Sequence, residues 1–227
     1  MTGSTWYLRR AVPWRPAAGC LVGAALLVAA VTRWPDTAGL FLPLVVLLGA
    51  SAAGFVFDET AVRVATATPR GTRWAPLNRL YAGSGLVVLG AALAVVAAGE
   101  AGSDRSDWAA LTLVVGGVTV LTALVASRRQ VPHPGSWISS TLVLLGLAPL
   151  VVGLMLGVRS PYPLEPWTDG WRAGWWLTGL IAWTVALLLV AVPNLLPARG
   201  RRQQASPDPV SAPGTRSARP PVRATGR

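Results

Sequence analysis

The run DTAGLFLPLVVLLGASAAGFVFD, residues 36–58, contains 21 uncharged residues between two aspartates. The hydrocarbon core of a bilayer is about 30 Å thick, and a helix of about 20 apolar residues crosses it. The run reaches this length, and a soluble domain rarely exposes so continuous an apolar stretch. It therefore predicts a membrane-spanning helix.

Five further runs of the same kind lie along the 227 residues, with 17 to 29 uncharged residues each. Only 13% of all residues are charged, whereas soluble domains carry about 25%. The sequence therefore predicts an all-α fold, a polytopic membrane protein with a bundle of six transmembrane helices. We place the spans near 17–32, 38–57, 81–98, 108–126, 137–157 and 173–192.

The first span has a competing interpretation as a secretory signal peptide, because Arg9, Arg10 and Arg15 precede it. Its apolar stretch slightly exceeds the usual hydrophobic region of such peptides, and no small-x-small cleavage site precedes Arg33. We therefore expect an uncleaved anchor.

The orientation follows from the arginines, which supply all 20 basic residues. With the N-terminus inside, the inner segments hold 16 of them and the outer segments hold 4. Cytoplasmic loops carry the excess of positive charge, so we expect a multi-pass protein of the cell membrane with both termini cytoplasmic. Because most arginines flank the spans, the bilayer is the expected partner and nucleic acid is not.

Three parts are expected along the chain. Residues 1–16 form a cytoplasmic amphipathic segment that suits the inner leaflet. Residues 17–197 hold the six spans. Residues 198–227 are rich in Arg and Pro with few large apolar side chains, which predicts a disordered cytoplasmic tail.

Residues that carry chemistry are scarce in this chain. There is one cysteine, Cys20, and one histidine, His133, and no P-loop or H-E-x-x-H motif. None of the six predicted spans contains an acid, a histidine or an arginine, which transporters coupled to ions and intramembrane enzymes place at bilayer depth. We therefore expect no catalytic residue, no metal site, no cofactor and no enzyme activity.

Tryptophans and small residues suggest how the helices sit and pack. Trp34, Trp108 and Trp171 fall at predicted outer ends of spans, where indole rings favour the headgroup level. The pairs Gly19 with Gly23 and Gly49 with Ala53 have the spacing that lets helices approach closely. A chain this rich in Ala and Gly also produces such pairs by chance.

Two connections stand out. The outer one, residues 158–170, contains three prolines, which predicts a short, stiff cap without regular helix throughout. The inner one, DETAVRVATATPRGTRWAPLNRL, starts at Asp58 and exceeds the usual length of helix connections, about 2–8 residues. Asp58 suits the N-cap of a helix that ends before Pro69. Its arginines fit either a protein partner or anionic lipid.

The stretch FDETAVRVATATPRGTRW, Phe57 to Trp74, is similar to the first cytoplasmic loop of small actinobacterial ABC permease-like proteins. Together with the six spans, residues 1–197 resemble ABC-2-type transporter permeases. The resemblance implies that a dimer of permease subunits, homo- or heteromeric, works with a separate ATP-binding subunit. It also implies that five residues of the loop face that subunit: Asp58, Glu59, Arg63, Arg70 and Arg73.

We therefore expect a permease-like subunit that provides the membrane path while a partner hydrolyses ATP. The alternative is a non-transporting membrane scaffold or accessory protein, which needs only packing and topology. An intramembrane enzyme is the least favoured interpretation because the spans lack acids and histidine.

Overall fold

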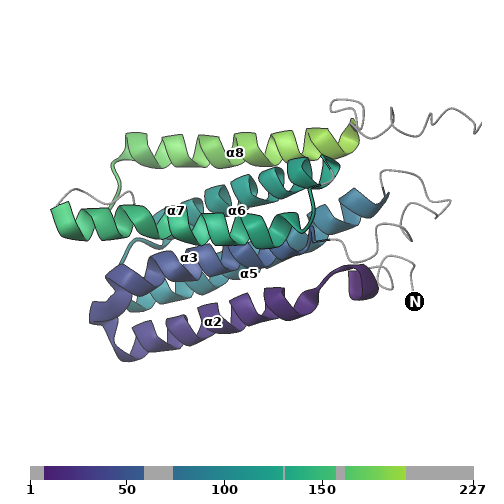
Figure 1. Cartoon of the computed structure of the whole chain (residues 1–227). Helices are drawn as coiled ribbons and strands as arrows, with labels where there is room; N and C mark the ends of the chain where they lie inside the picture. Colours follow the sequence, from purple (N-terminus) through teal and green to yellow (C-terminus); the bar gives the residue numbers. More distant parts are fainter. Residues whose placement is uncertain (1–7, 59–73, 130, 157–161, 193–227) are drawn as a thin grey trace, which may run out of the picture. The chain divides into compact units, whose positions relative to one another are not determined.

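The computed structural model describes residues 8–58, 74–129, 131–156 and 162–192. Six long helices account for most of them, and no strand occurs within these ranges. All six are long and apolar enough to cross a membrane, which confirms the predicted six-helix fold class. They are α2 (Trp14–Arg33), α3 (Ala38–Phe55), α5 (Trp74–Glu100), α6 (Arg105–Arg128), α7 (Pro134–Leu156) and α8 (Asp169–Ala191), with the short 3-10 turn η1 (Pro35–Thr37) between the first two (Figure 1).

Several helices extend beyond the predicted spans. The largest difference is at α5, which begins at Trp74 rather than near residue 81. The predicted span begins after Arg79, because hydrocarbon excludes charge. A helix itself continues through arginine, which is a good helix former, and Pro76 lies in the first turn, where its missing N–H is not needed. A charged residue therefore does not mark the end of a helix.

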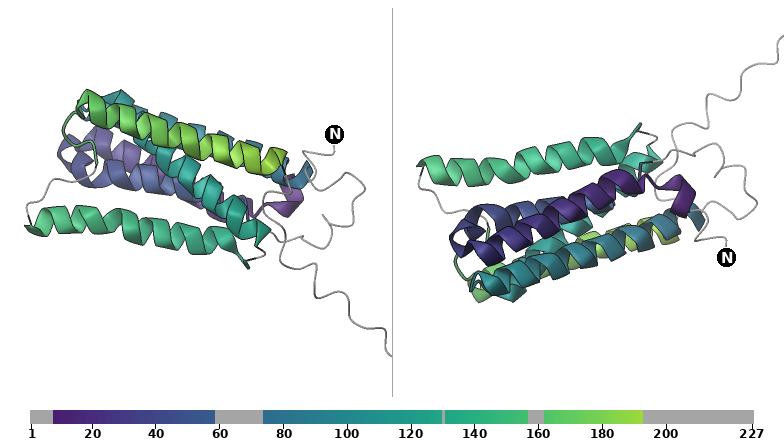
Figure 2. Two further views of the ribbon diagram at one scale, coloured as in Figure 1. Left: turned by 90° about the horizontal axis from the view of Figure 1, so that it is seen from above. Right: turned by 90° about the horizontal axis from the view of Figure 1, so that it is seen from below.

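Helix α3 occupies the centre of the bundle and packs against α2, α5, α6 and α7. Helix α6 continues the packing, with α5 and α8 against it. The two remaining helices each pack mainly against one neighbour: α7 against α3, and α8 against α6. Figure 2 shows α7 along one edge of the bundle, with α3 between α7 and α5.

The helices alternate in direction, so the bundle has two ends (Figure 1). We call one the Asp58 end; it gathers the starts of α2, α5 and α7 and the ends of α3, α6 and α8. Its apolar cluster includes Phe57, Leu124 and Ile138. We call the other the Asp107 end, and its cluster includes Leu42, Trp108 and Tyr162.

The N-terminal segment packs on the Asp58 end from residue 8 onward. A helical turn covers residues 8–11, and the Trp14 indole donates to the Leu8 carbonyl at 2.8 Å. Ala11 and Val12 are buried, and Val12 belongs to the apolar cluster of this end. Part of the apolar face that we expected against lipid therefore contacts helices.

Glycine sets the closest approach between α3 and α5. A Cβ atom built on Gly49 would lie 2.9 Å from the Cα of Gly90, so the two backbones leave no room for a side chain. Ala53, one turn further, is fully buried. In α2, by contrast, a Cβ on Gly19 would meet nothing within 4 Å. Of the two predicted small-residue pairs, the one in α3 therefore lies at a tight helix crossing.

Candidate functional site

Of the five residues expected to face a partner, the structure describes Asp58. Glu59, Arg63, Arg70 and Arg73 lie outside the described residues. Asp58 comes directly after α3, is buried, and has its carboxylate directed at the start of α7.

Asp58 caps α7 from 77 residues away in the sequence. Its Oδ1 atom accepts the N–H of Gly135 at 2.5 Å, and its Oδ2 atom accepts the N–H of Ser136 at 3.2 Å. These are the second and third residues of α7, whose N–H groups have no partner within the helix. The side chain of the N-cap residue itself usually accepts them. Asp58 was expected to cap a helix within the connection that follows it. In the structure, its carboxylate caps α7 instead.

The residue that precedes α7 explains why the cap comes from another helix. His133 occupies the N-cap position, since its carbonyl accepts the N–H of Trp137 at 3.4 Å, and its φ angle is +46°. N-cap residues that use their own side chain take extended backbone angles. His133 stands between Pro132 and Pro134, both with a fixed φ. The acceptor is therefore supplied by another helix.

The surroundings of Asp58 act on its pKa in opposite directions. Burial raises the pKa of Asp58, while the N–H groups of Gly135 and Ser136 and the nearby His133 lower it, and burial has the larger effect. The folded state therefore favours the protonated carboxyl more than the unfolded chain does. The two N–H groups favour the ionised carboxylate, whose oxygens both accept, and burial opposes its charge.

The backbones of α3 and α7 approach each other closely next to Asp58. A Cβ built on Gly135 would lie 2.5 Å from the carbonyl oxygen of Gly54 and 2.8 Å from the Cα of Phe55. One turn along, the Ser139 hydroxyl donates to the Ser51 carbonyl at 3.3 Å. The start of α7 therefore lies on α3 through small residues and polar contacts.

A second cluster of charge joins α6 to α8 at the Asp107 end. Arg172 Nε donates to Asp107 Oδ1 at 2.6 Å, and Arg172 Nη2 donates to Asp104 Oδ2 at 2.8 Å. The backbone N–H of Trp167 donates to Asp107 Oδ2 at 3.0 Å. Asp107 is fully buried, so this carboxylate depends on the two donors that reach it.

Asp104 also caps its own helix, in contrast to Asp58. Its Oδ1 atom accepts the hydroxyl and the backbone N–H of Ser106, both at 2.8 Å. Hydrogen bonds from the Ser106 side chain and backbone hold the pKa of Asp104 below its ordinary value. This carboxylate therefore stays ionised and available to Arg172 at neutral pH.

Aromatic rings cover the Asp107 end. The rings of Trp108 and Tyr162 stack with centroids 6.4 Å apart, and the Tyr162 hydroxyl donates to the Gly146 carbonyl of α7. The rings of Trp167 and Trp175 stack at 5.3 Å. Residues 162–168 contain no helix, which agrees with the expected cap for the part of that connection that the structure describes.

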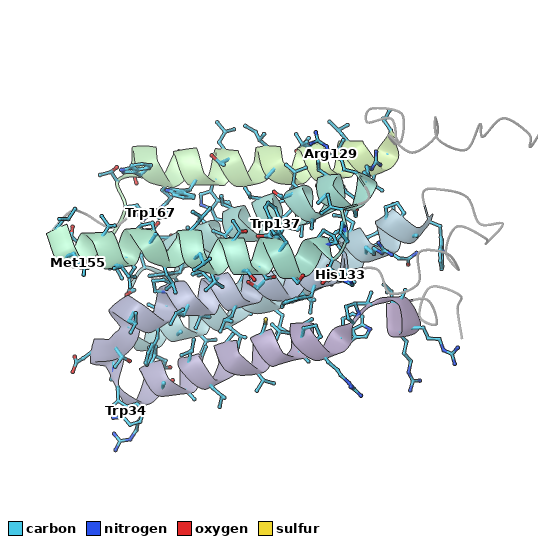
Figure 3. The ribbon with its side chains drawn as sticks, in the orientation of Figure 1. Trp34, Arg129, His133, Trp137, Met155 and Trp167 are labelled. Carbon is cyan, nitrogen blue, oxygen red and sulfur yellow. The ribbon has the colours of Figure 1, made fainter. Side chains whose placement is uncertain are left out.

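The structure corrects the position of one tryptophan. Trp108 was expected at the headgroup level, but its side chain is fully buried in the apolar cluster that also includes residues of α3 and α5. Trp34 and Trp171 are exposed by more than half, as expected of rings at a membrane surface (Figure 3 shows Trp34). An indole ring at the end of a span can be buried between helices or exposed at the membrane surface, and the sequence pattern does not distinguish the two.

Within the described ranges, the polar side chains in the middle of the bundle carry no charge. Thr112 and Thr119 donate to carbonyls of their own helix at 2.8 and 2.7 Å. Between helices, the Trp183 indole of α8 donates to the Leu113 carbonyl of α6 at 3.1 Å. No three His, Cys, Asp or Glu side chains of the described ranges lie close enough to hold a metal ion.

Charge separates between the two ends. Within the described ranges, the Asp58 end has Asp58 as its one acid and six arginines, which are Arg9, Arg10, Arg15, Arg79, Arg128 and Arg129. The described part of the Asp107 end has three arginines and six acids, which are Asp36, Glu100, Asp104, Asp107, Glu165 and Asp169. The basic end carries the connection from Asp58 to α5.

Sequence reasoning missed both carboxylate clusters, because it treated these acids as parts of loops. One signal in the sequence pointed to an acceptor such as Asp58. Pro134 and Gly135 begin the fifth helix, whose first N–H groups have no partner within the helix and need an acceptor from elsewhere. No comparable signal pairs Asp107 with Arg172. Comparison of the chain with protein-family models, curated proteins and solved structures finds no match.

Proposed function

We propose that this chain is a permease-like subunit of an ABC-type transporter in the cell membrane, with both termini cytoplasmic. A separate ATP-binding subunit hydrolyses ATP on the cytoplasmic side. The observation that carries the proposal is the basic Asp58 end, which carries the long connection after α3. An excess of arginine is typical of cytoplasmic ends, so this connection lies where such a subunit would meet it.

The membrane path belongs between two permease subunits under this proposal. In the described part of the bundle middle, buried threonines bond to their own backbone, and α3 and α5 meet through glycine. These contacts favour a packed interior over a polar channel within one copy. A dimer, homo- or heteromeric, supplies the second wall of the path.

Docking is assigned to the four residues of the connection that follow Asp58. Asp58 itself is not accessible to a partner, because it is buried and its carboxylate accepts two N–H groups of α7. Glu59, Arg63, Arg70 and Arg73 carry the recognition, and the excess of arginine suits an acidic surface on the partner.

The same packed interior favours a second candidate, a membrane scaffold or accessory protein that transports nothing. Such a protein needs stable helix packing and a defined topology only. Helix crossings closed by glycine and ionic contacts at the Asp107 end satisfy that need. The two candidates differ in whether an ATP-binding subunit associates with the connection.

Co-expression tests the proposal. The chain is expressed with each P-loop ATPase encoded next to its reading frame, and the complex is purified in detergent through a tag on this chain. We expect one ATPase to be retained in stoichiometric amount and its ATP hydrolysis to be stimulated. The absence of retention with every neighbouring ATPase would favour the scaffold.

A pair of matched variants tests the docking residues. Arg70→Glu with Arg73→Glu reverses two charges of the connection, and Arg201→Glu with Arg202→Glu makes the same change in the tail. We expect at least a tenfold loss of retention for the first variant and none for the second. Insertion of both is checked by reporter fusion beforehand. Equal retention of the two correctly inserted variants contradicts docking through Arg70 and Arg73.

A further inference from the structure

Helix α7 is held to the bundle in two separate places. At its start, Pro134, Gly135, Ile138 and Ser139 are buried, and near its other end Leu150 is buried. Residues 140–145 are exposed or half-buried. Figure 3 shows His133 at one end of this helix and Met155 at the other.

The far attachment is apolar and aromatic. Leu150 lies in the same cluster as Trp108 and Tyr162, and the Tyr162 hydroxyl donates to the Gly146 carbonyl in the second half of α7. Gly146 also lies against Leu47 of α3, where a Cβ would overlap the leucine side chain. None of these contacts of Gly146 and Leu150 involves Asp58, so substitution of Asp58 leaves them in place.

The near attachment depends on Asp58. Besides the buried Ile138, this attachment includes the two hydrogen bonds to Asp58, the Ser139 hydroxyl on the Ser51 carbonyl, and the backbone of Gly135 on Gly54. Without an acceptor, the N–H of the buried Gly135 would be left unpaired, which favours its movement into water.

The connection that leads into α7 is strained. His133 has a φ angle of +46°, an uncommon conformation for a residue with a side chain. Such conformations persist only where the surroundings hold them. The Asp58 cap fixes the two residues that follow Pro134, so release of the cap also releases the strain at His133.

We infer that Asp58 is a latch and that α7 is a swinging helix: loss of the Asp58 cap lets the start of α7 move away from α3 while its far end stays in place. The inference goes beyond the proposed function. Asp58 directly precedes the connection to which we assign docking. The test uses this chain alone, so its outcome is independent of any ATPase.

The experiment measures distances between spin labels at both ends of α7. All variants carry Cys20→Ala, so that only the introduced cysteines react. The near pair is Ser140→Cys on α7 with Tyr81→Cys on α5, and the far pair is Met155→Cys with Val96→Cys. All four side chains are exposed. Each pair is measured in lipid nanodiscs.

Asp58→Ala removes both acceptors and is expected to lengthen and broaden the near-pair distance while the far pair stays unchanged. Asp58→Asn keeps one acceptor oxygen and is expected to give a partial shift. The matched control is Asp36→Ala, which removes an exposed acid at the opposite end and is expected to change neither pair.

Gly135→Ala provides a second route if Asp58→Ala fails to insert. The added methyl group would lie 2.5 Å from the Gly54 oxygen and 2.9 Å from Asp58 Oδ1, so it pushes α7 from α3 while the carboxylate is still present. We expect the same near-pair shift. An unchanged near pair in the inserted variants overturns the inference, and so does equal broadening of both pairs, which indicates general loosening.

Discussion

Two buried carboxylates show how single residues join distant parts of this chain. Asp58 accepts two backbone N–H groups of α7, and Asp107 accepts the Arg172 guanidinium and the Trp167 N–H. A buried carboxylate is costly unless donors reach it, and each has at least two. The difference lies in the donors, since Asp58 faces neutral N–H groups and Asp107 faces a cation.

The Asp107 cluster predicts a graded loss of stability. Arg172→Ala leaves the buried Asp107 carboxylate with the Trp167 N–H as its donor, and we expect a clear loss in the free energy of unfolding. Asp169→Ala is the matched control. Its carboxylate lies 3.9 Å from the same arginine but is fully exposed, so we expect almost no change. Denaturation by SDS in mixed micelles, followed by tryptophan fluorescence, measures both. Equal losses would contradict the assigned importance of Asp107.

At the scale of elements, the packing of helices depends on where side chains are missing. Lipid chains are as apolar as leucine, so burial of apolar surface alone does not hold membrane helices together. Close backbone approach provides van der Waals contact instead. The crossing of α3 with α5 through Gly49 and Gly90 is of this kind, and it lies on the central helix of the bundle.

The crossing predicts opposite results for two glycines. Gly49→Ala places a methyl group 2.9 Å from the Cα of Gly90, and backbone atoms cannot rotate away. We expect a loss of about 1–3 kcal/mol in the free energy of unfolding from overpacking. Gly19→Ala meets nothing within 4 Å and replaces glycine in a helix, so we expect no loss or a small gain. The same SDS titration compares them, and a larger loss for Gly19→Ala would refute the proposed crossing.

For the whole molecule, the distribution of charge distinguishes the two ends of the bundle. The described arginines favour the Asp58 end, and the described acids favour the Asp107 end. The arginine bias is the property that sets orientation during insertion, whereas acids contribute little. The long connection and the start of α2 share the arginine-rich end.

Reporter fusions test the resulting topology. We expect fusions after Gln130 and after Arg202 to report cytoplasm, because both follow segments on the arginine-rich side. A fusion after Gly102, in the turn between α5 and α6, is expected to report the outside and serves as the opposite control. A cytoplasmic signal after Gly102, or an external signal from either other position, would contradict the orientation.

The sequence by itself determined that the chain has six membrane-spanning helices and approximately where they lie. Hydropathy is a local property, since each run of uncharged residues is long enough to cross the hydrocarbon by itself. The stiffness expected of the outer connection is local too, because each proline fixes its own φ. The predicted helix ends were less accurate, as at α5. A charged residue limits the apolar run that predicts a span, but the helix itself can continue through it.

Only the tertiary structure decided which residues meet. Asp58 and Gly135 lie 77 residues apart, Asp107 and Arg172 lie 65 apart, and Trp108 is buried although its position in the sequence matches that of exposed tryptophans. In a soluble helix the polar face shows which side is buried. In a membrane the lipid-facing side and the protein-facing side are both apolar, so the pattern within one span does not reveal its neighbours. The partners of these residues follow from how the six helices pack.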